Sequence, residues 1–466
     1  MRLHYTTFLL LLFYSLFLPA QPAKVDSSAV FVVQNIFMLG NKKTNESIIL
    51  RELTFKKGDN LPFYALSTHF EKSENQLLNT DLFNAVDVFN DSNQNVYVIV
   101  KEDWYIYPIP ILQIADRNFN QWWLTKDFSR LNYGIRLDWY NFSGKADKLK
   151  LLLNLGYTKQ VGLSYEVPFI DKNKHWGIGA AGVFSTNREV WAYPNNDKLV
   201  FFSDQNNFLI KRKSLGINTT YRKGYFDKHN IGISFLDVQI ADTVASAEVN
   251  SNYLFGGHNK QQTINIAYSY TYDKRDIRGY PLKGYFIKTI AELDLYNPNK
   301  GFSGFNTELT AIANIYIPIA KNIYANSGIT TSTSRLDKAP YIYTPSLGYA
   351  NTFVRGYEYY VVDGKDYFLW RSNLKYALVN NKKYYSRTLP HAFSTVSFSC
   401  MAGIFYDLGF MHSPYVYANN RLPNTLLHGF GAGIDLIFFY DRVLRLEFTQ
   451  NGLKEHGFYL SFYAPL

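Results

Sequence analysis

The feature that most constrains the fold of this chain is a two-residue alternation of apolar and polar side chains. It recurs in strand-length segments from Tyr105 onward. In the segment 370–378, for example, the apolar residues Trp370, Leu374, Tyr376 and Leu378 alternate with Arg371, Asn373 and Lys375. Because successive side chains of a strand point to opposite faces, one face is apolar and the other is charged. Charged residues spaced two apart cannot face lipid, so we expect a membrane barrel with a wet lumen.

About sixteen such segments can be counted between residues 105 and 466, an even number, as in bacterial single-chain barrels. If the N-terminal part lies in the periplasm, the connections after odd-numbered strands lie outside the cell. These include the long segments 336–366 and 410–427, as expected for such barrels. We therefore predict an all-β transmembrane barrel of about 16 antiparallel strands over residues 105–466.

The composition fits a barrel better than a single soluble core. Aromatic residues make up 17% of the chain, charged residues 18%, and the mean hydropathy is −0.19. Lipid-facing aromatic residues around a polar lumen give this mixture. No apolar run after residue 25 approaches the roughly 20 residues of a membrane helix. The net charge of +10 is spread along alternating segments without a reader motif, which argues against nucleic acid as a partner.

The first twenty residues are typical of a secretory signal peptide. Arg2 precedes an apolar run over residues 8–18, and Ala20 offers a small residue for cleavage. The single cysteine, Cys400, excludes both a lipoprotein anchor after this segment and an internal disulfide.

Residues 27–103 indicate a small α+β domain with the order β-α-α-β-β. We predict a strand over 30–36, a short helix capped by Thr44, and a longer helix over 66–78. Two further strands are predicted, one beginning at Phe83 and one over 96–100.

The long polar segment 336–366 contains Val354-Arg355-Gly356-Tyr357, an unusual sequence for a solvated loop tip. If this loop folds into a wet barrel, the permanent charge of Arg355 requires a carboxylate on the inner wall. Asp407 is the favoured partner, and Asp435 and Glu447 are competing acceptors. The alternative is a mobile surface loop with an incidental arginine.

The two ends of the barrel sequence carry prolines. Pro108 and Pro110 lie two apart in the first predicted strand and remove donors from one edge, and the last strand ends in Ala464-Pro465-Leu466. We interpret Pro108, Pro110 and Phe462 as parts of a weakly paired lateral seam where client strands pair. The alternative is that the prolines only mark strand ends.

Several of these motifs resemble the BamA/TamA-like outer-membrane barrel superfamily, a POTRA domain followed by a bacterial surface antigen barrel. The N-terminal resemblance lies in Gly40-Asn41, Arg51-Glu52-Leu53, Gly58-Asp59 and Leu82-Phe83. The barrel resemblance lies in Val354-Arg355-Gly356-Tyr357, in Phe405-x-Asp407-x-Gly409 and in the turn 273–284. The resemblance implies that Arg355 pairs with Asp407 in the lumen and that the POTRA domain binds client chains by strand addition.

The resemblance implies a protein that inserts or exports polypeptides at the outer membrane of a Gram-negative bacterium, with its N-terminal domain in the periplasm. The expected partners are outer-membrane lipid and unfolded client polypeptides. Docking of the N-terminal domain to a periplasmic or lipoprotein subunit remains an alternative role for it. The alternative functions are a dedicated secretion translocator for one exoprotein and a passive porin-like channel. The nine histidines show no metal-ligand spacing and no serine lies in a nucleophile elbow, so we expect neither an enzyme nor a cofactor.

Overall fold

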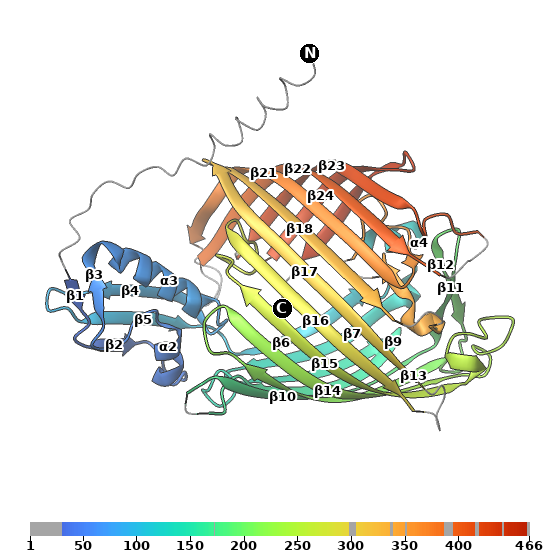
Figure 1. Cartoon of the computed structure of the whole chain (residues 1–466), viewed down its shortest axis with the longest axis horizontal. Helices are drawn as coiled ribbons and strands as arrows, with labels where there is room; N and C mark the ends of the chain where they lie inside the picture. Colours follow the sequence, from blue (N-terminus) through green and yellow to red (C-terminus); the bar gives the residue numbers. More distant parts are fainter. Residues whose placement is uncertain are drawn as a thin grey trace, which may run out of the picture.

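The computed structural model describes residues 30–463 apart from 172, 298–303, 336–338, 350–351, 386–394, 415–418 and 440–441. The predicted signal peptide and residues 27–29 lie outside the described residues. Figure 1 shows a small domain, in blue, at one end of a large sheet that is curved into a barrel.

The small domain packs two helices against a three-stranded sheet. The sheet has the order β2-β5-β4, with β2 (Ile36–Leu39), β4 (Phe83–Asn90) and β5 (Val96–Glu102). The helices are α2 (Glu46–Glu52) and α3 (Leu66–Leu78). Buried residues of α3 lie three and four positions apart, at Leu66, Phe70, Ser73 and Leu77, which places them on one face of the helix. Leu66, Phe70 and Leu77 share a single hydrophobic core with the inner faces of β4 and β5.

Two local predictions for this domain were wrong. The strand expected over 30–36 is divided into β1 (Val30–Val32), which pairs with β3 (Asn60–Pro62), and β2, which pairs with β5. The change of partner falls between Val33 and Gln34: the backbone N–H of buried Val33 still donates to Asp59 beside β3, whereas that of Gln34 donates to Gln94 beside β5. Thr44 does not cap α2, because its hydroxyl is buried against the hydroxyl of Tyr105 at 2.8 Å.

The large sheet contains sixteen antiparallel strands in sequence order, which confirms the predicted fold class. Its strands are β6 (Ile106–Ile114), β7 (Leu131–Tyr140), β8 (Lys148–Gly156), β9 (Thr158–Val167), β10 (Trp176–Asn187), β13 (Ile210–Tyr221), β14 (Asp227–Ile240), β15 (Lys260–Asp273), β16 (Gly284–Tyr296), β17 (Gly304–Ala320), β18 (Ile323–Ser334), β21 (Asp366–Tyr385), β22 (Thr395–His412), β23 (Leu426–Phe438), β24 (Arg442–Asn451) and β25 (His456–Tyr463).

The alternation of the sequence reappears as two faces of this sheet. On β21, Leu374, Tyr376 and Leu378 are exposed on the outside by 43%, 50% and 56%. Arg371 and Lys375 of the same strand line a cavity inside the barrel. The outer surface is therefore apolar and the lumen is charged, as a membrane barrel requires.

Short elements follow β10 and β18 in the connections of the barrel. The hairpin of β11 (Glu189–Asn195) and β12 (Lys198–Ser203) lies between β10 and β13. The pair β19 (Pro345–Leu347) and β20 (Val362–Asp363) lies between β18 and β21. Among the described residues, no helix has both the length and the apolar character needed to cross a membrane.

The small domain is docked onto the turns at one end of the barrel. Buried Glu52 of α2 accepts hydrogen bonds from both terminal nitrogens of Arg222, at 3.2 and 3.3 Å. Asn45 donates its backbone N–H to Gly144 in the turn between β7 and β8. These contacts set the position of the domain relative to the barrel end.

Candidate functional site in the barrel lumen

The segment 345–363 without residues 350–351, which we call the lumen loop, folds back against the inner wall of the barrel. Val354 and Tyr357 are buried, and the backbone N–H of Tyr357 donates to the carbonyl of Val354, closing a tight turn. Gly356 lies within this turn at φ +96°, a region that side-chain-bearing residues rarely adopt. The turn points the side chain of Arg355 at the wall.

Every N–H direction of the Arg355 guanidinium meets an acceptor. Nε and Nη2 donate to the two oxygens of Asp407 at 2.7 and 2.6 Å, which is a bidentate pair. The remaining donors reach Asn373 at 2.7 Å, Glu447 at 3.0 Å and the carbonyl of Ser372 at 3.3 Å. Because an arginine has five N–H donors, the site leaves none unused.

The anchor is shielded from water. Arg355 is 5% exposed, Asp407 is fully buried, and the guanidinium lies 3.7 Å from the ring centre of Phe405. Burial alone would lower the pKa of Arg355, but the hydrogen bonds and charge of Asp407, together with the charge of Glu447, raise it. The guanidinium therefore stays charged, and Phe405 adds a cation–π contact.

Glycines on the wall let the loop backbone approach closely. A Cβ on Gly429 of β23 would overlap the carbonyl oxygen of Arg355, and a Cβ on Gly409 of β22 would overlap the side chain of Val354. The loop is also held from β24, because Asn451 donates its side-chain amide to the carbonyl of Gly356 at 2.8 Å. The two glycines thus leave room for the turn against the wall, and Asn451 binds its backbone there.

A buried carboxyl group lies inside the loop itself. Glu358 is 3% exposed and accepts the backbone N–H of Gly356 at 2.9 Å. Burial raises the pKa of Glu358 to about 8, and the negative charge of Glu447 acts in the same direction. Glu358 therefore carries a proton near neutral pH.

Asp435, a competing acceptor in the sequence interpretation, belongs to a second cluster. It binds Arg445 at 2.6 and 3.0 Å and Lys375 at 2.8 Å. The hydroxyl of Tyr280 donates to the same carboxylate at 2.5 Å. Tyr280 lies in the connection between β15 and β16, within the turn whose sequence resembles the superfamily, so this turn also enters the lumen.

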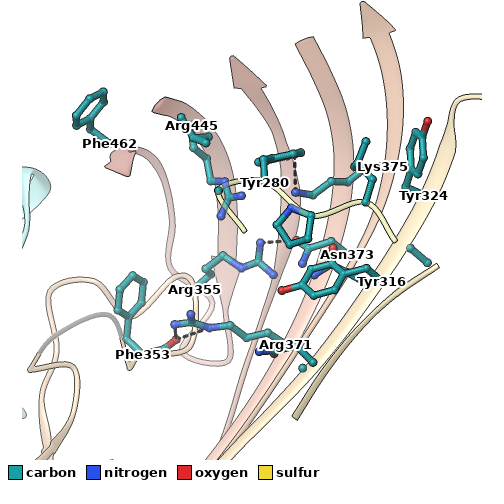
Figure 2. Close-up of a pocket in the computed structure, with 18 residues that line it drawn as sticks. Tyr280, Tyr316, Tyr324, Phe353, Arg355, Arg371, Asn373, Lys375, Arg445 and Phe462 are labelled. Carbon is teal, nitrogen blue, oxygen red and sulfur yellow. Dashed lines mark hydrogen bonds between the residues drawn. The ribbon is translucent and has the colours of Figure 1, made fainter. Parts of the chain in front are cut away.

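The two clusters line a cavity of about 560 Å³. Figure 2 shows Arg355, Arg371 and Lys375 around it, with Phe462 at its side. Since Phe462 belongs to the last strand, the cavity extends from the anchored loop to the end of the sheet.

The strands at the two ends of the sheet are not joined by a ladder within the described residues: β6 pairs only with β7, and β25 only with β24. Tyr105 and Ala115, which directly flank β6, both form backbone hydrogen bonds toward the β7 side. In an antiparallel sheet the N–H and C=O of one residue face the same neighbouring strand, and successive residues alternate between the two sides. The backbone groups of Pro108 and Pro110, which alternate with those that face β7, therefore face the free edge. Two donors are thus missing from that edge.

The structure brings together Val354, Arg355, Gly356 and Tyr357 with Phe405, Asp407 and Gly409. It places Pro108 and Pro110 on the edge strand β6, separately from this group. Sequence reasoning did not assign roles to Asn373, Gly429, Asn451 and Glu358. Of these four, only Asn373 could have been placed from the sequence, because in the apolar–polar alternation of its strand it falls on the same face as Arg371 and Lys375.

Comparisons with known proteins add to this geometry. Residues 31–103 match the POTRA family model, described as a surface antigen variable number repeat. No curated protein matches the chain. Among solved structures, BamA from Haemophilus ducreyi lacking POTRA domains 1–3 aligns with a TM-score of 0.49 at 13% identity, covering 93% of this chain and 83% of that chain. CdiB from Acinetobacter baumannii aligns with a TM-score of 0.49 at 9% identity (93% and 73% covered), and CdiB from Escherichia coli with 0.49 at 11% (96% and 92% covered).

The fold and the family model define a β-barrel protein with an N-terminal POTRA domain. The resemblance to the BamA/TamA-like superfamily, inferred from the sequence motifs, is confirmed by the POTRA match together with the sixteen-stranded barrel.

Proposed function

We propose that this protein inserts or exports polypeptides at the outer membrane of a Gram-negative bacterium, without catalysis or cofactor. The observation that carries this proposal is that, in the part of the chain that the structure describes, no ladder joins the edge strands β6 and β25 at the two ends of the sheet. An unpaired edge offers a row of backbone donors and acceptors to an incoming extended chain. The POTRA domain, docked at one barrel end, supplies a periplasmic site for such chains.

The anchored loop supports this role over that of a passive pore. Arg355 with its buried acceptors holds the lumen loop against β22 and β24, close to the strands that end the sheet. The ion pairs of Arg355 thus hold β22 and β24 in place next to the seam between β6 and β25, where the described residues form no ladder. A simple diffusion channel requires neither a free edge nor a POTRA domain.

The proposal is tested by bridging the seam. Ile109→Cys in β6 and Ser461→Cys in β25, joined by a bifunctional thiol reagent in a Cys400→Ala background, are expected to stop client assembly. The control joins Ile404→Cys and Ala432→Cys, which already face each other across β22 and β23. Unchanged assembly with the seam bridged would contradict the proposal.

Depletion of the protein followed by outer-membrane proteomics identifies the clients. Loss of several barrel proteins is expected for an insertase, whereas loss of one secreted protein identifies a dedicated translocator. An unchanged outer-membrane and secreted proteome would overturn both forms of the proposal and leave the passive channel.

A further inference from the structure

The segment that follows β6 lies against the free edge of β25. It contains α4 (Phe119–Thr125), and the side chain of Asn120, 7% exposed, points at that edge. The backbone N–H of Leu460 donates to Oδ1 of Asn120 at 3.1 Å, and Nδ2 of Asn120 donates back to the carbonyl of Leu460 at 3.4 Å. A neighbouring strand would make the same reciprocal pair of bonds. One carboxamide thus substitutes for a strand at one position.

The bonded position is central to the edge. Backbone groups of alternate residues face the same side of a strand, so those of Phe458 and Phe462 point outward with those of Leu460. An incoming strand that pairs along β25 therefore needs the position that Asn120 holds.

The same segment also holds the lumen loop. Nη1 of Arg117 donates to the carbonyl of Tyr360 at 2.9 Å and to that of Gly348. Nδ2 of Asn118 donates to the carbonyl of Glu358 at 2.7 Å. Three residues of the short stretch 117–120, Arg117, Asn118 and Asn120, therefore connect the loop anchored by Arg355 to the last strand of the sheet.

The aromatic residues of helix α4 pack mainly within their own segment. Its apolar residues are not buried against the barrel, since Trp123 and Leu124 are 56% and 63% exposed. Trp122 packs instead on Phe119 and Phe128 within the same segment, with ring centres 5.9 and 5.4 Å apart. The contact with β25 thus depends on the carboxamide more than on apolar burial.

We propose that residues 117–120 form a latch that occupies the free edge of β25 and must be displaced before a client strand pairs there. This inference rests on the proposed function. Because the latch also binds the carbonyls of Glu358 and Tyr360, its displacement loosens the lumen loop at the moment the edge becomes free. Figure 1 places α4 at the barrel end away from the small domain, so the latch closes the seam from that side.

Hydrogen exchange of the full chain in lipid nanodiscs tests the latch without any client. Asn120→Leu removes both bonds to Leu460, and we expect the amide of Leu460 to exchange roughly five- to tenfold faster. The matched control is Gln121→Leu, a neighbour on α4 whose backbone N–H, and not its side chain, bonds Asn118. Asn120→Asp keeps an acceptor for the N–H of Leu460 and should give an intermediate rate. Equal exchange in Asn120→Leu and wild type would overturn the latch.

A folding assay then tests what the latch does. Proteoliposomes containing the full chain are given a urea-unfolded eight-stranded outer-membrane barrel as the probe, and Asn120→Leu is expected to fold it several times faster than wild type or Gln121→Leu. Faster exchange without faster folding would overturn the inhibitory role. If the wild-type protein does not accelerate folding at all, the proposed insertase function fails for this probe, whereas the exchange measurement still decides whether the latch exists.

Discussion

Replacing Arg355 by alanine removes the cation through which the lumen loop binds Asp407 and Glu447 on the wall. Asp407, which is fully buried, and Glu447, 5% exposed, then lose their shared partner. Leaving buried charge without its partner costs about 3–5 kcal/mol. We expect the lower part of this range, because the site borders the lumen cavity and water can reach the carboxylates once the loop moves.

The cost falls on the loop more than on the barrel, since the strands keep their ladders. A loss of about 3 kcal/mol corresponds to a change of roughly a hundredfold in the opening equilibrium of the loop. Arg355→Lys keeps the charge but loses the bidentate geometry and should lie between alanine and wild type. In the double variant with Asp407→Asn the two losses should not add, because both remove the same pairing.

Hydrogen exchange over residues 352–360 measures this opening in the full chain, and heat-dependent gel migration reports whether the barrel remains folded. Arg421→Ala is the matched control. It removes the exposed side chain of Arg421 in the connection between β22 and β23. The hydrogen bonds of Arg421 come from its backbone N–H, which donates to Asp197 and is kept in the variant. Exchange of the loop as slow in Arg355→Ala as in the control would refute the anchoring role.

Three further outcomes follow from the same geometry. Gly429→Ala places a methyl group where the carbonyl of Arg355 lies, so the lumen loop should be displaced and its exchange increased while β23 remains paired. Burial raises the pKa of Glu358 in the folded protein from 4.5 to about 8. The protonated carboxyl group therefore stabilises the folded loop fully below about pH 4.5, and this contribution is lost as pH rises through about 8. A spin label in the loop should become more mobile from pH 6 to pH 9, and Glu358→Gln should flatten this response. Glu52→Ala should weaken docking of the POTRA domain by about 2 kcal/mol, seen as faster proteolysis near residue 104, because Arg222 loses its carboxylate partner.

The barrel could be predicted from the sequence because its signal is local. Each strand needs an apolar outer face and a polar inner face, so the period of two marks every segment without knowledge of its neighbours. The same alternation assigned Asp407 to the inner wall. In the small domain, helical spacing fixed α3 in the same way.

The remainder depended on contacts between distant segments. Whether Arg355 binds Glu447 or Asp435 depends on the register of β23 and β24, which no local sequence pattern determines. In the structure Arg355 binds Glu447, whereas Asp435 binds Lys375 and Arg445. Asn120 lies in the short helix α4 between two strands, where the two-residue alternation of the barrel does not apply, so its place at the edge of β25 could not be anticipated. The division of β1 from β2 likewise depends on distant partners, because Val33 bonds Asp59 while its neighbour Gln34 bonds Gln94.

Photo-crosslinking at the seam tests the central claim most directly. A photoreactive amino acid at Ile109 of β6, in cells that are assembling outer-membrane proteins, should capture polypeptide clients, whereas the same group at Ile404, which is 59% exposed on the paired strand β22, should not. Adducts at Ile109 that are absent at Ile404 are the predicted result. Client adducts at neither position, or equally at both, would contradict the account.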